Sequence, residues 1–503
     1  MAMNRKVRAM LLGALTISIS GTQAYAQTPP KASGSGRKSF EEFRKGILSD
    51  YKDFRQTLLD RYADFLNGEW HEYESFNGVR RDSKPKPQTV PRAEPSGSRI
   101  KPETDTAPVI SEPASPASKT SPLPETARKN GGRITPRPDG KDEFSFYGLP
   151  VQMPRVDFNI TRKLYSNADY AGQWRDLQKA DVAARLLPHI KSLASEMGLN
   201  DYLTYRLINS YIDSRFNDAD ATSRMSAIHY LLAGLGYDVR IAITGQGVPL
   251  LLIPFRQTIY ARTYMMVEGE KYYVFEPEGF SLAKAGPQNI MTCRLPDNLD
   301  RGRKMDLILG ELNLPYSPKA FEFECGPIHL KGEVNENLMP VLYNYPQMPV
   351  SDFAASNLQP ELRDRLVSQM RSQLDGLDGD EKVARLLTFM HSVFSYATDE
   401  EFHGFEKPYF LEETLYYPKN DCEDRAIFYT WFLWHALGRE AQLVSFPGHE
   451  AATVRLDNPV EGTGYDYQGT RYYISDPTFI GSKTGMIMPV YKDTPPTIDC
   501  TFK

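Results

Sequence analysis

The sequence predicts an α+β fold in which a central helix packs on an antiparallel sheet, and it predicts that this unit occurs twice. Three short segments recur in the same order along the chain. They are FSFYG at 144–148 and FEFECG at 321–326, LGYDV at 235–239 and LGREA at 437–441, and YYVFEP at 272–277 and YYISDP at 472–477. The alternative explanation is chance similarity between short aromatic strands.

The first residues have the features of a secretory signal peptide. Lys6 and Arg8 precede an apolar stretch at 10–20, and the sequence AYA at 24–26 is a small-x-small cleavage site. An apolar stretch of about ten residues is half of what a membrane-spanning helix needs. We therefore expect residues 1–26 to be cleaved and the mature protein to be exported to a bacterial periplasm, with no membrane span.

Residues 27–80 have an amphipathic helical pattern, whereas residues 81–141 have the composition of a disordered linker. Apolar residues recur at spacings of three and four, which places one apolar stripe along a helix. They are Phe40, Phe43, Ile47, Tyr51, Phe54, Leu58, Tyr62 and Phe65. This stripe at 40–65 either packs against the same chain or docks a partner. Of the 37 prolines, 12 lie between residues 81 and 140 among polar residues, so that segment cannot bury enough apolar surface to fold.

Charge and cysteine content exclude two classes of protein. The 503 residues have a formal net charge of −5, so no overall positive field attracts nucleic acid. The four cysteines are too few for a disulfide scaffold in a chain of this length. If Cys422 is a thiol, then Cys293, Cys325 and Cys500 can form one bridge at most. Zinc is not expected, because no Cys-x-x-Cys or His-x-x-x-His pair is present.

The two predicted domains are residues 142–300 and 319–503, and the second has the clearer pattern. A helix is expected at 383–396, and another begins at Cys422 and ends before Gly438. This second helix is apolar on nearly all sides, which is typical of a buried central helix. Strands are expected at 441–446, 451–456 and 471–475.

Three residues of the second domain are candidates for nucleophilic catalysis. Cys422 lies in the first turn of the central helix, where Asn420 or Asp421 can cap the helix and its dipole favours a thiolate. His449 lies at the start of the second strand after this helix, and Asp476 follows a later strand. If helix and sheet pack face to face, these side chains can act as nucleophile, base and base-orienting carboxylate.

This pattern resembles the transglutaminase-like superfamily of cysteine acyl-transfer enzymes, in which a cysteine at a helix start precedes histidine and aspartate on successive strands. The sequences EETL at 412–415 and DCED at 421–424 are also similar to bacterial transglutaminase-like cysteine proteinases. The similarity covers about 100 residues, 388–489, and the rest of the second domain more loosely. It implies a papain/transglutaminase-like core and a Cys422-His449-Asp476 triad.

The expected reaction is attack of Cys422 on an amide carbonyl of a protein or peptide, followed by release of the thioester acyl-enzyme. The backbone N–H of Cys422 and a side chain just upstream, Tyr417 or Asn420, would bind the oxyanion. Transfer to water makes the protein a protease or peptidase, and transfer to an amine makes it a cross-linking transglutaminase. A binding scaffold that does not use the triad is the alternative outside catalysis.

No cofactor is required by this chemistry, although calcium has candidate ligands. Asp421, Glu423 and Asp424 supply carboxylate oxygens, which calcium prefers, and some of the resembling proteinases bind calcium at these residues. Acidic residues at a helix start are also favourable through the helix dipole alone.

The first domain is expected to be a degenerate copy without catalytic activity. Counting along the repeat places Asp220 or Ala221 at the nucleophile position, Tyr260 near the histidine position and Glu276 at the acid position. None of the four can replace the thiol or the imidazole. The expected role of this copy is to pack on the catalytic domain and shape its cleft.

Overall fold

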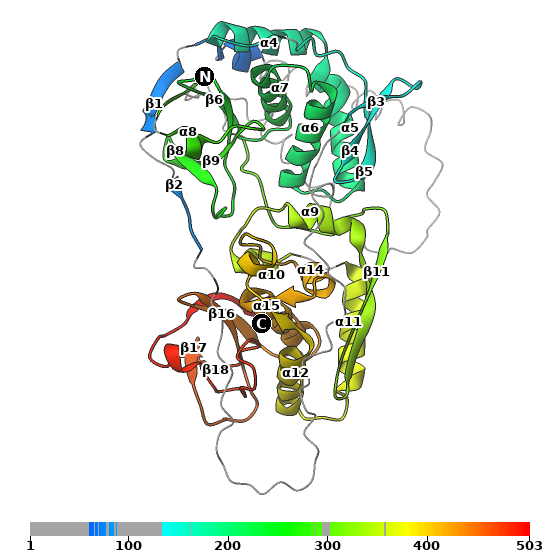
Figure 1. The fold of residues 1–503 in the computed structure, drawn as a ribbon, viewed down its shortest axis with the longest axis vertical. Helices are drawn as coiled ribbons and strands as arrows, with labels where there is room; N and C mark the ends of the chain where they lie inside the picture. The colour runs from blue at the N-terminus through cyan, green and yellow to red at the C-terminus, as the bar shows by residue number, and fades with distance from the viewer. Residues whose placement is uncertain are drawn as a thin grey trace, which may run out of the picture. The chain divides into compact units, whose positions relative to one another are not determined.

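The structure is a computed structural model of an α+β protein with mainly antiparallel sheets, so the predicted class is confirmed (Figure 1). It describes residues 60–64, 66–68, 70–76, 80–84, 87, 133–160, 162–286, 288–293, 302–356 and 359–503. Within these residues no helix combines the length and the apolar character needed to cross a membrane. The predicted signal peptide at 1–26 lies outside the described residues.

The part of the chain up to residue 293 contains a seven-stranded antiparallel sheet in the order β1-β10-β6-β7-β9-β8-β2. Its strands are β1 (Trp70–Phe76), β2 (Arg80–Arg81), β6 (Arg240–Thr244), β7 (Pro249–Ile253), β8 (Thr263–Val267), β9 (Glu270–Phe275) and β10 (Gln288–Cys293). A small sheet holds β3 (Thr135–Pro136), β4 (Lys141–Phe146) and β5 (Leu149–Pro154). The helices are α4 (Asn167–Lys179), α5 (Val182–Glu196), α6 (Asp201–Arg215), α7 (Ala221–Gly234) and α8 (Leu282–Ala285). The largely buried helix α7 packs on β6 and β7.

The part from residue 318 onward contains a five-stranded antiparallel sheet in the order β17-β18-β16-β15-β19. Its strands are β15 (Ala441–Phe446), β16 (His449–Val454), β17 (Gly464–Tyr467), β18 (Thr470–Ile474) and β19 (Thr497–Phe502). Two smaller pairs are β11 (Pro318–Cys325) with β12 (Ile328–Asn335), and the parallel pair β13 (Ser395–Tyr396) with β14 (Lys419–Asn420). The helices are η1 (Glu336–Leu338), α9 (Met339–Tyr343), α10 (Val350–Ala354), α11 (Pro360–Gln373), α12 (Gly379–Val393), α13 (Asp399–Phe402), α14 (Leu411–Tyr416), α15 (Cys422–His435) and η2 (Pro489–Tyr491). Helix α15 packs on β15 and β16, and the β11-β12 hairpin runs along α11 (Figure 1).

Five strands follow the same order in both sheets. When strands are matched along the chain, β10-β6-β7-β9-β8 corresponds to β19-β15-β16-β18-β17. Each set is preceded by a buried helix that is followed by a glycine in the left-handed region, Gly236 (φ 88°) after α7 and Gly438 (φ 64°) after α15. Glycine adopts this conformation without the strain that a Cβ atom would cause.

This strand order changes one of the expected matches between the copies. Ala221 is the first residue of α7, as Cys422 is of α15, and Pro249 begins β7 as His449 begins β16. Tyr260, expected near the histidine position, instead lies in the connection between β7 and β8. The loops before β7 and β16 differ by only two residues, so counting from Gly236 and Gly438 leads to the start of β7 and not to Tyr260.

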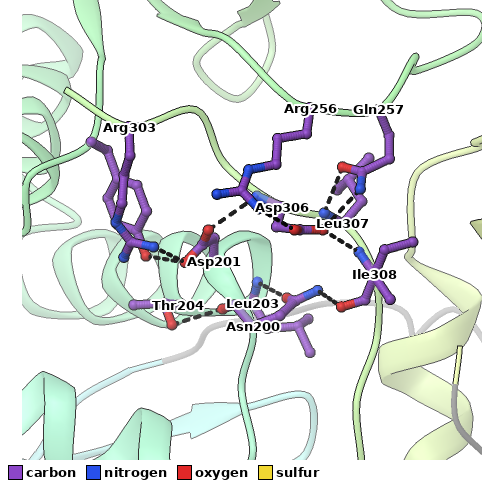
Figure 2. A network of polar contacts seen from close by, with 11 residues as sticks. Asn200, Asp201, Leu203, Thr204, Arg256, Gln257, Arg303, Asp306, Leu307 and Ile308 are labelled. Atoms are coloured by element: carbon purple, nitrogen blue, oxygen red, sulfur yellow. Dashed lines mark hydrogen bonds and ion pairs between the residues drawn. The ribbon is translucent and has the colours of Figure 1, made fainter. Parts of the chain in front are cut away.

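A polar network holds the segment that joins the two parts (Figure 2). The carboxylate of Asp201, at the start of α6, accepts hydrogen bonds from Arg303 (2.9 Å) and from the backbone N–H of Asp306 (3.1 Å). Tyr345 of the second part donates its hydroxyl to the carbonyl of Leu307 (2.8 Å). The joining segment therefore contacts both parts, and one cluster of buried apolar side chains includes residues of both.

The two segments that precede the predicted domains contact them where the structure describes them. Residues 60–64 are helical, and the ring of Tyr62 stacks on Trp174 with 4.5 Å between centroids. The end of the apolar stripe at 40–65 thus packs on its own chain, whereas residues 40–59 lie outside the described residues. Strands β2 and β3 pair with β8 and β4. Both ends of the segment 81–141 therefore contain structure that its average composition did not predict.

Candidate active site

Cys422 is the first residue of α15, and its side chain is buried in the second part of the chain. Asp421 is the N-cap residue, and its backbone N–H donates to Asp424 Oδ2 (3.2 Å). Apolar residues cover nearly every side of α15, so the helix is buried in the core, and its first turn is buried with the rest. As a result, only 1% of Cys422 is exposed.

His449 and Asp476 meet at one end of the sheet. β16 and β18 are antiparallel neighbours, so the start of β16 lies beside the residues that follow β18. His449 Nε2 lies 2.8 Å from Asp476 Oδ2. Asp476 Oδ1 accepts the backbone N–H groups of Thr478 (2.8 Å) and Phe479 (3.2 Å). Burial opposes ionisation, but His449 and these two N–H groups lower the pKa of Asp476 below its usual value.

This contact determines which nitrogen of His449 can accept a proton. The carboxylate of Asp476 is an acceptor, so it favours the tautomer with the proton on Nε2. His449 Nδ1 is buried and has no hydrogen-bond partner among the described residues. The imidazole lies parallel to the ring of Tyr491 (2° between planes, 5.7 Å between centroids), which fixes its orientation.

Cys422 and His449 line the same cavity, which has a volume of about 400 Å³. Among the described residues the thiol donates to Glu423 Oε2 (3.1 Å) and accepts the backbone N–H of Glu450, rather than bonding to His449. Burial, followed by the charges of Glu423 and Asp421, raises the pKa of the Cys422 thiol well above its usual range. These surroundings therefore favour the neutral thiol over the expected thiolate.

The two candidate oxyanion residues have different surroundings. Tyr417 packs its ring against His403 (5.1 Å between centroids) and Tyr409 (5.2 Å). Asn420 is buried, its Oδ1 accepts from Arg425 Nε (2.7 Å), and its Nδ2 has no hydrogen-bond partner among the described residues. Neither residue is among those that line the cavity.

The predicted calcium ligands belong to three overlapping groups among the described residues. Asp421 and Asp424 form one group with Asp399, Glu423 forms another with Asp399 and Glu406, and Asp421 and Glu423 form a third with Cys422, each with ligand atoms within 4.8 Å of one another. Burial and the neighbouring carboxylates raise the pKa values of Asp399, Asp421 and Asp424. Both carboxylate oxygens of Asp421 are buried. This donor set fits a hard cation such as calcium.

Three features of the site were missed by the sequence analysis. His391 Nε2 lies 3.0 Å from the backbone oxygen of Asp476 and helps to position it. Glu450 shares a hydrogen bond with Asp499 beside the cavity. Lys84, from the predicted linker, forms an ion pair with Glu423 (2.6 Å). Only Glu450 had a sequence signal, its position next to His449.

The remaining predicted cysteines and first-domain residues have the following contacts. Cys325, Cys422 and Cys500 are free thiols. In the first part, the Asp220 side chain accepts the N–H of Thr222 (2.9 Å), and Glu276 accepts the N–H of Leu282 (2.7 Å).

Comparisons with protein-family models, curated proteins and solved structures found no match for this chain.

Proposed function

We propose that residues 319–503 form an exported cysteine hydrolase of the transglutaminase-like type that cleaves an amide bond of a protein or peptide. The observation that carries this proposal is the arrangement around His449. One imidazole nitrogen contacts the doubly anchored carboxylate of Asp476, the other has no hydrogen-bond partner among the described residues, and the ring shares a cavity with Cys422. A base held in this way can accept a proton from a nearby nucleophile, and the Cys422 thiol is the proposed nucleophile in that cavity.

In the first step the Cys422 thiol turns from Glu423 and transfers its proton to His449 Nδ1. The resulting thiolate forms a bond with the carbonyl carbon of the substrate, and the carbonyl electron pair moves to oxygen. The backbone N–H of Cys422 is the proposed donor to that oxyanion. The proton on Nδ1 then passes to the leaving amine as the C–N bond breaks, which leaves a thioester on Cys422.

In the second step the thioester is hydrolysed. His449 Nδ1 takes a proton from water, the hydroxide attacks the thioester carbonyl, and the thiol leaves with the proton returned by His449. Asp476 keeps the imidazole in the required tautomer and stabilises its protonated form in both steps.

The matched strand orders support the proposal that the fold is a duplicated papain/transglutaminase-like core. They also support a first copy without catalytic activity, because Ala221 and Pro249 occupy the positions of Cys422 and His449. Bound calcium would supply positive charge to the carboxylates of Asp399, Asp421 and Asp424. That charge would stabilise the first turn of α15, which carries the nucleophile.

The test is labelling of the full mature chain with a thiol-directed activity-based probe that needs general-base assistance, followed by mass spectrometry of the labelled peptide. We expect Cys422 to be labelled, and labelling to be lost in His449→Ala. His329→Ala is the matched control, because His329 lies on β12 of the same part and outside the cavity. Equal labelling of both variants, or an inert Cys422, would overturn the proposal and favour a binding scaffold.

A further inference from the structure

A short segment between the N-terminal region and the predicted linker is anchored beside the cavity. Arg80 and Arg81 form β2, which pairs with β8. The backbone carbonyl of Asp82 accepts the N–H of Ala261 (2.8 Å), and its carboxylate forms an ion pair with Lys271 (2.7 Å). These contacts fix the chain two residues before Lys84.

Lys84 extends from this anchored segment into the Cys422 cavity. Its side chain is 13% exposed, and its Nζ lies 2.6 Å from Glu423 Oε1 and 3.9 Å from Glu406 Oε1. The other oxygen of Glu423 accepts the Cys422 thiol. One carboxylate therefore contacts both the ammonium group of Lys84 and the candidate nucleophile.

Other residues that line the cavity would also favour a bound lysine side chain. Glu450 and Asp499 line it, and Glu450 Oε1 is buried without a hydrogen-bond partner among the described residues. Pro349 and Val350 add an apolar surface, on which the methylene groups of a lysine can lie while its ammonium group reaches a carboxylate. An ammonium with three donors matches several separate carboxylates better than the planar fork of a guanidinium does.

We propose that this acidic part of the cavity is a binding subsite for a lysine side chain of a peptide substrate, and that Lys84 occupies it in cis. The inference rests on the proposed function in one respect, because it names the side chain that a substrate places beside Cys422. A substrate lysine must displace Lys84, so the chain competes with its own substrate. This competition weakens binding in proportion to the occupancy of the subsite.

The first experiment measures peptide binding to the full mature chain with Cys422→Ala, which prevents turnover. The probe is a fluorescent peptide with the sequence of residues 82–87 in which norleucine replaces Lys86, and its partner has norleucine at both lysine positions. In the Lys84→Met protein we expect the lysine peptide to bind at least tenfold more tightly than its partner, a difference of about 1.4 kcal/mol. We also expect Lys84→Met to bind the lysine peptide at least tenfold more tightly than the chain that retains Lys84. Lys419→Met, which removes an exposed lysine near Cys422, should leave binding unchanged.

Equal binding of the two peptides to Lys84→Met would overturn the subsite, and equal binding of the lysine peptide with and without Lys84 would overturn its occupation in cis. A second measurement needs no variant: acetic anhydride should acetylate Lys84 at least tenfold more slowly than Lys419 in the intact chain, and equal rates would overturn the occupancy. The binding experiment uses Cys422→Ala and therefore tests the subsite independently of catalysis. If the lysine peptide binds more tightly but the active chain is not labelled by the probe, the proposed function is wrong and the subsite stands. If the active chain is labelled but the two peptides bind equally, the subsite is wrong and the proposed function stands.

Discussion

Replacing Asp476 with asparagine should switch the tautomer of His449 while the fold survives. In the native chain one oxygen of Asp476 accepts two backbone N–H groups, from Thr478 and Phe479, and the other contacts His449 Nε2. Asparagine has only one carbonyl oxygen. Directing its NH₂ group at the two backbone donors would lose two buried hydrogen bonds, at about 1–3 kcal/mol each.

The carbonyl of the new side chain should therefore stay with the backbone, and its NH₂ group should face His449. The imidazole then satisfies that donor by moving its proton from Nε2 to Nδ1. Since Nδ1 can no longer accept a proton from Cys422, we expect turnover to fall about 10⁴-fold, as for the same substitution in a serine-protease triad. That loss corresponds to about 5.5 kcal/mol of transition-state stabilisation.

The assay is a two-dimensional ¹H–¹⁵N NMR experiment on the imidazole rings, which reports the tautomer without a substrate, with the His449 signals assigned by their loss in His449→Gln. We expect Nε2–H in the native chain and Nδ1–H in Asp476→Asn, at nearly the native thermal stability. Asp476→Ala is the contrasting control, because it imposes no tautomer but leaves the backbone N–H groups of Thr478 and Phe479 unpaired. It should lose about 2–6 kcal/mol of stability. An Nε2–H tautomer retained in Asp476→Asn would refute the reasoning.

Two further predictions follow from the buried acids and the thiol. Folded-state pKa values of Asp399, Asp421 and Asp424 lie above their unfolded values, so their contribution to stability is lost as the pH rises from about 4 through the raised values. In EGTA, the stability advantage of Asp421→Asn over the native chain should grow between pH 5 and pH 8. In excess calcium the native chain should be the more stable of the two. Melting curves that change with neither pH nor calcium would count against the calcium site. The iodoacetamide reaction of Cys422 should accelerate about tenfold per pH unit up to at least pH 9. Glu423→Gln should shift that rise to lower pH, whereas a rate that levels off below pH 7 would show a stabilised thiolate.

The elements around the candidate site could be predicted because their signals are local. Helix α15 is apolar on nearly all sides, and the strands expected at 441–446, 451–456 and 471–475 were found at 441–446, 449–454 and 470–474. The contact of His449 with Asp476 required only that the strands following the helix be antiparallel neighbours. The predicted strands 451–456 and 471–475 are such neighbours, as β16 and β18, although β17, which was not predicted, lies between them in the sequence and at the edge of the sheet.

Long-range contacts had no such signal. Lys84 lies in a segment whose average composition predicts disorder, yet one pair of residues in β2 and one ion pair of Asp82 suffice to anchor it. Asp399 lies 22 positions before Asp421 and joins it only through the fold. The neutral state of Cys422 depends on burial and on the direction of the Glu423 side chain, and neither can be read from spacing.

The buried charges explain why the resting site can be neutral and still be competent. The helix dipole favours a thiolate at Cys422, but this effect contributes at most about 2 kcal/mol, whereas burial beside Glu423 and Asp421 opposes ionisation more strongly. A cation beside these carboxylates makes ionisation of Cys422 less unfavourable. On Glu423 this cation is Lys84 or a substrate lysine, and on Asp421 it would be calcium. A substrate lysine that displaces Lys84 would supply the same positive charge to Glu423 and would also position the scissile amide. A site with Lys84 removed and no substrate lysine should therefore react more slowly than one in which either ammonium group pairs with Glu423.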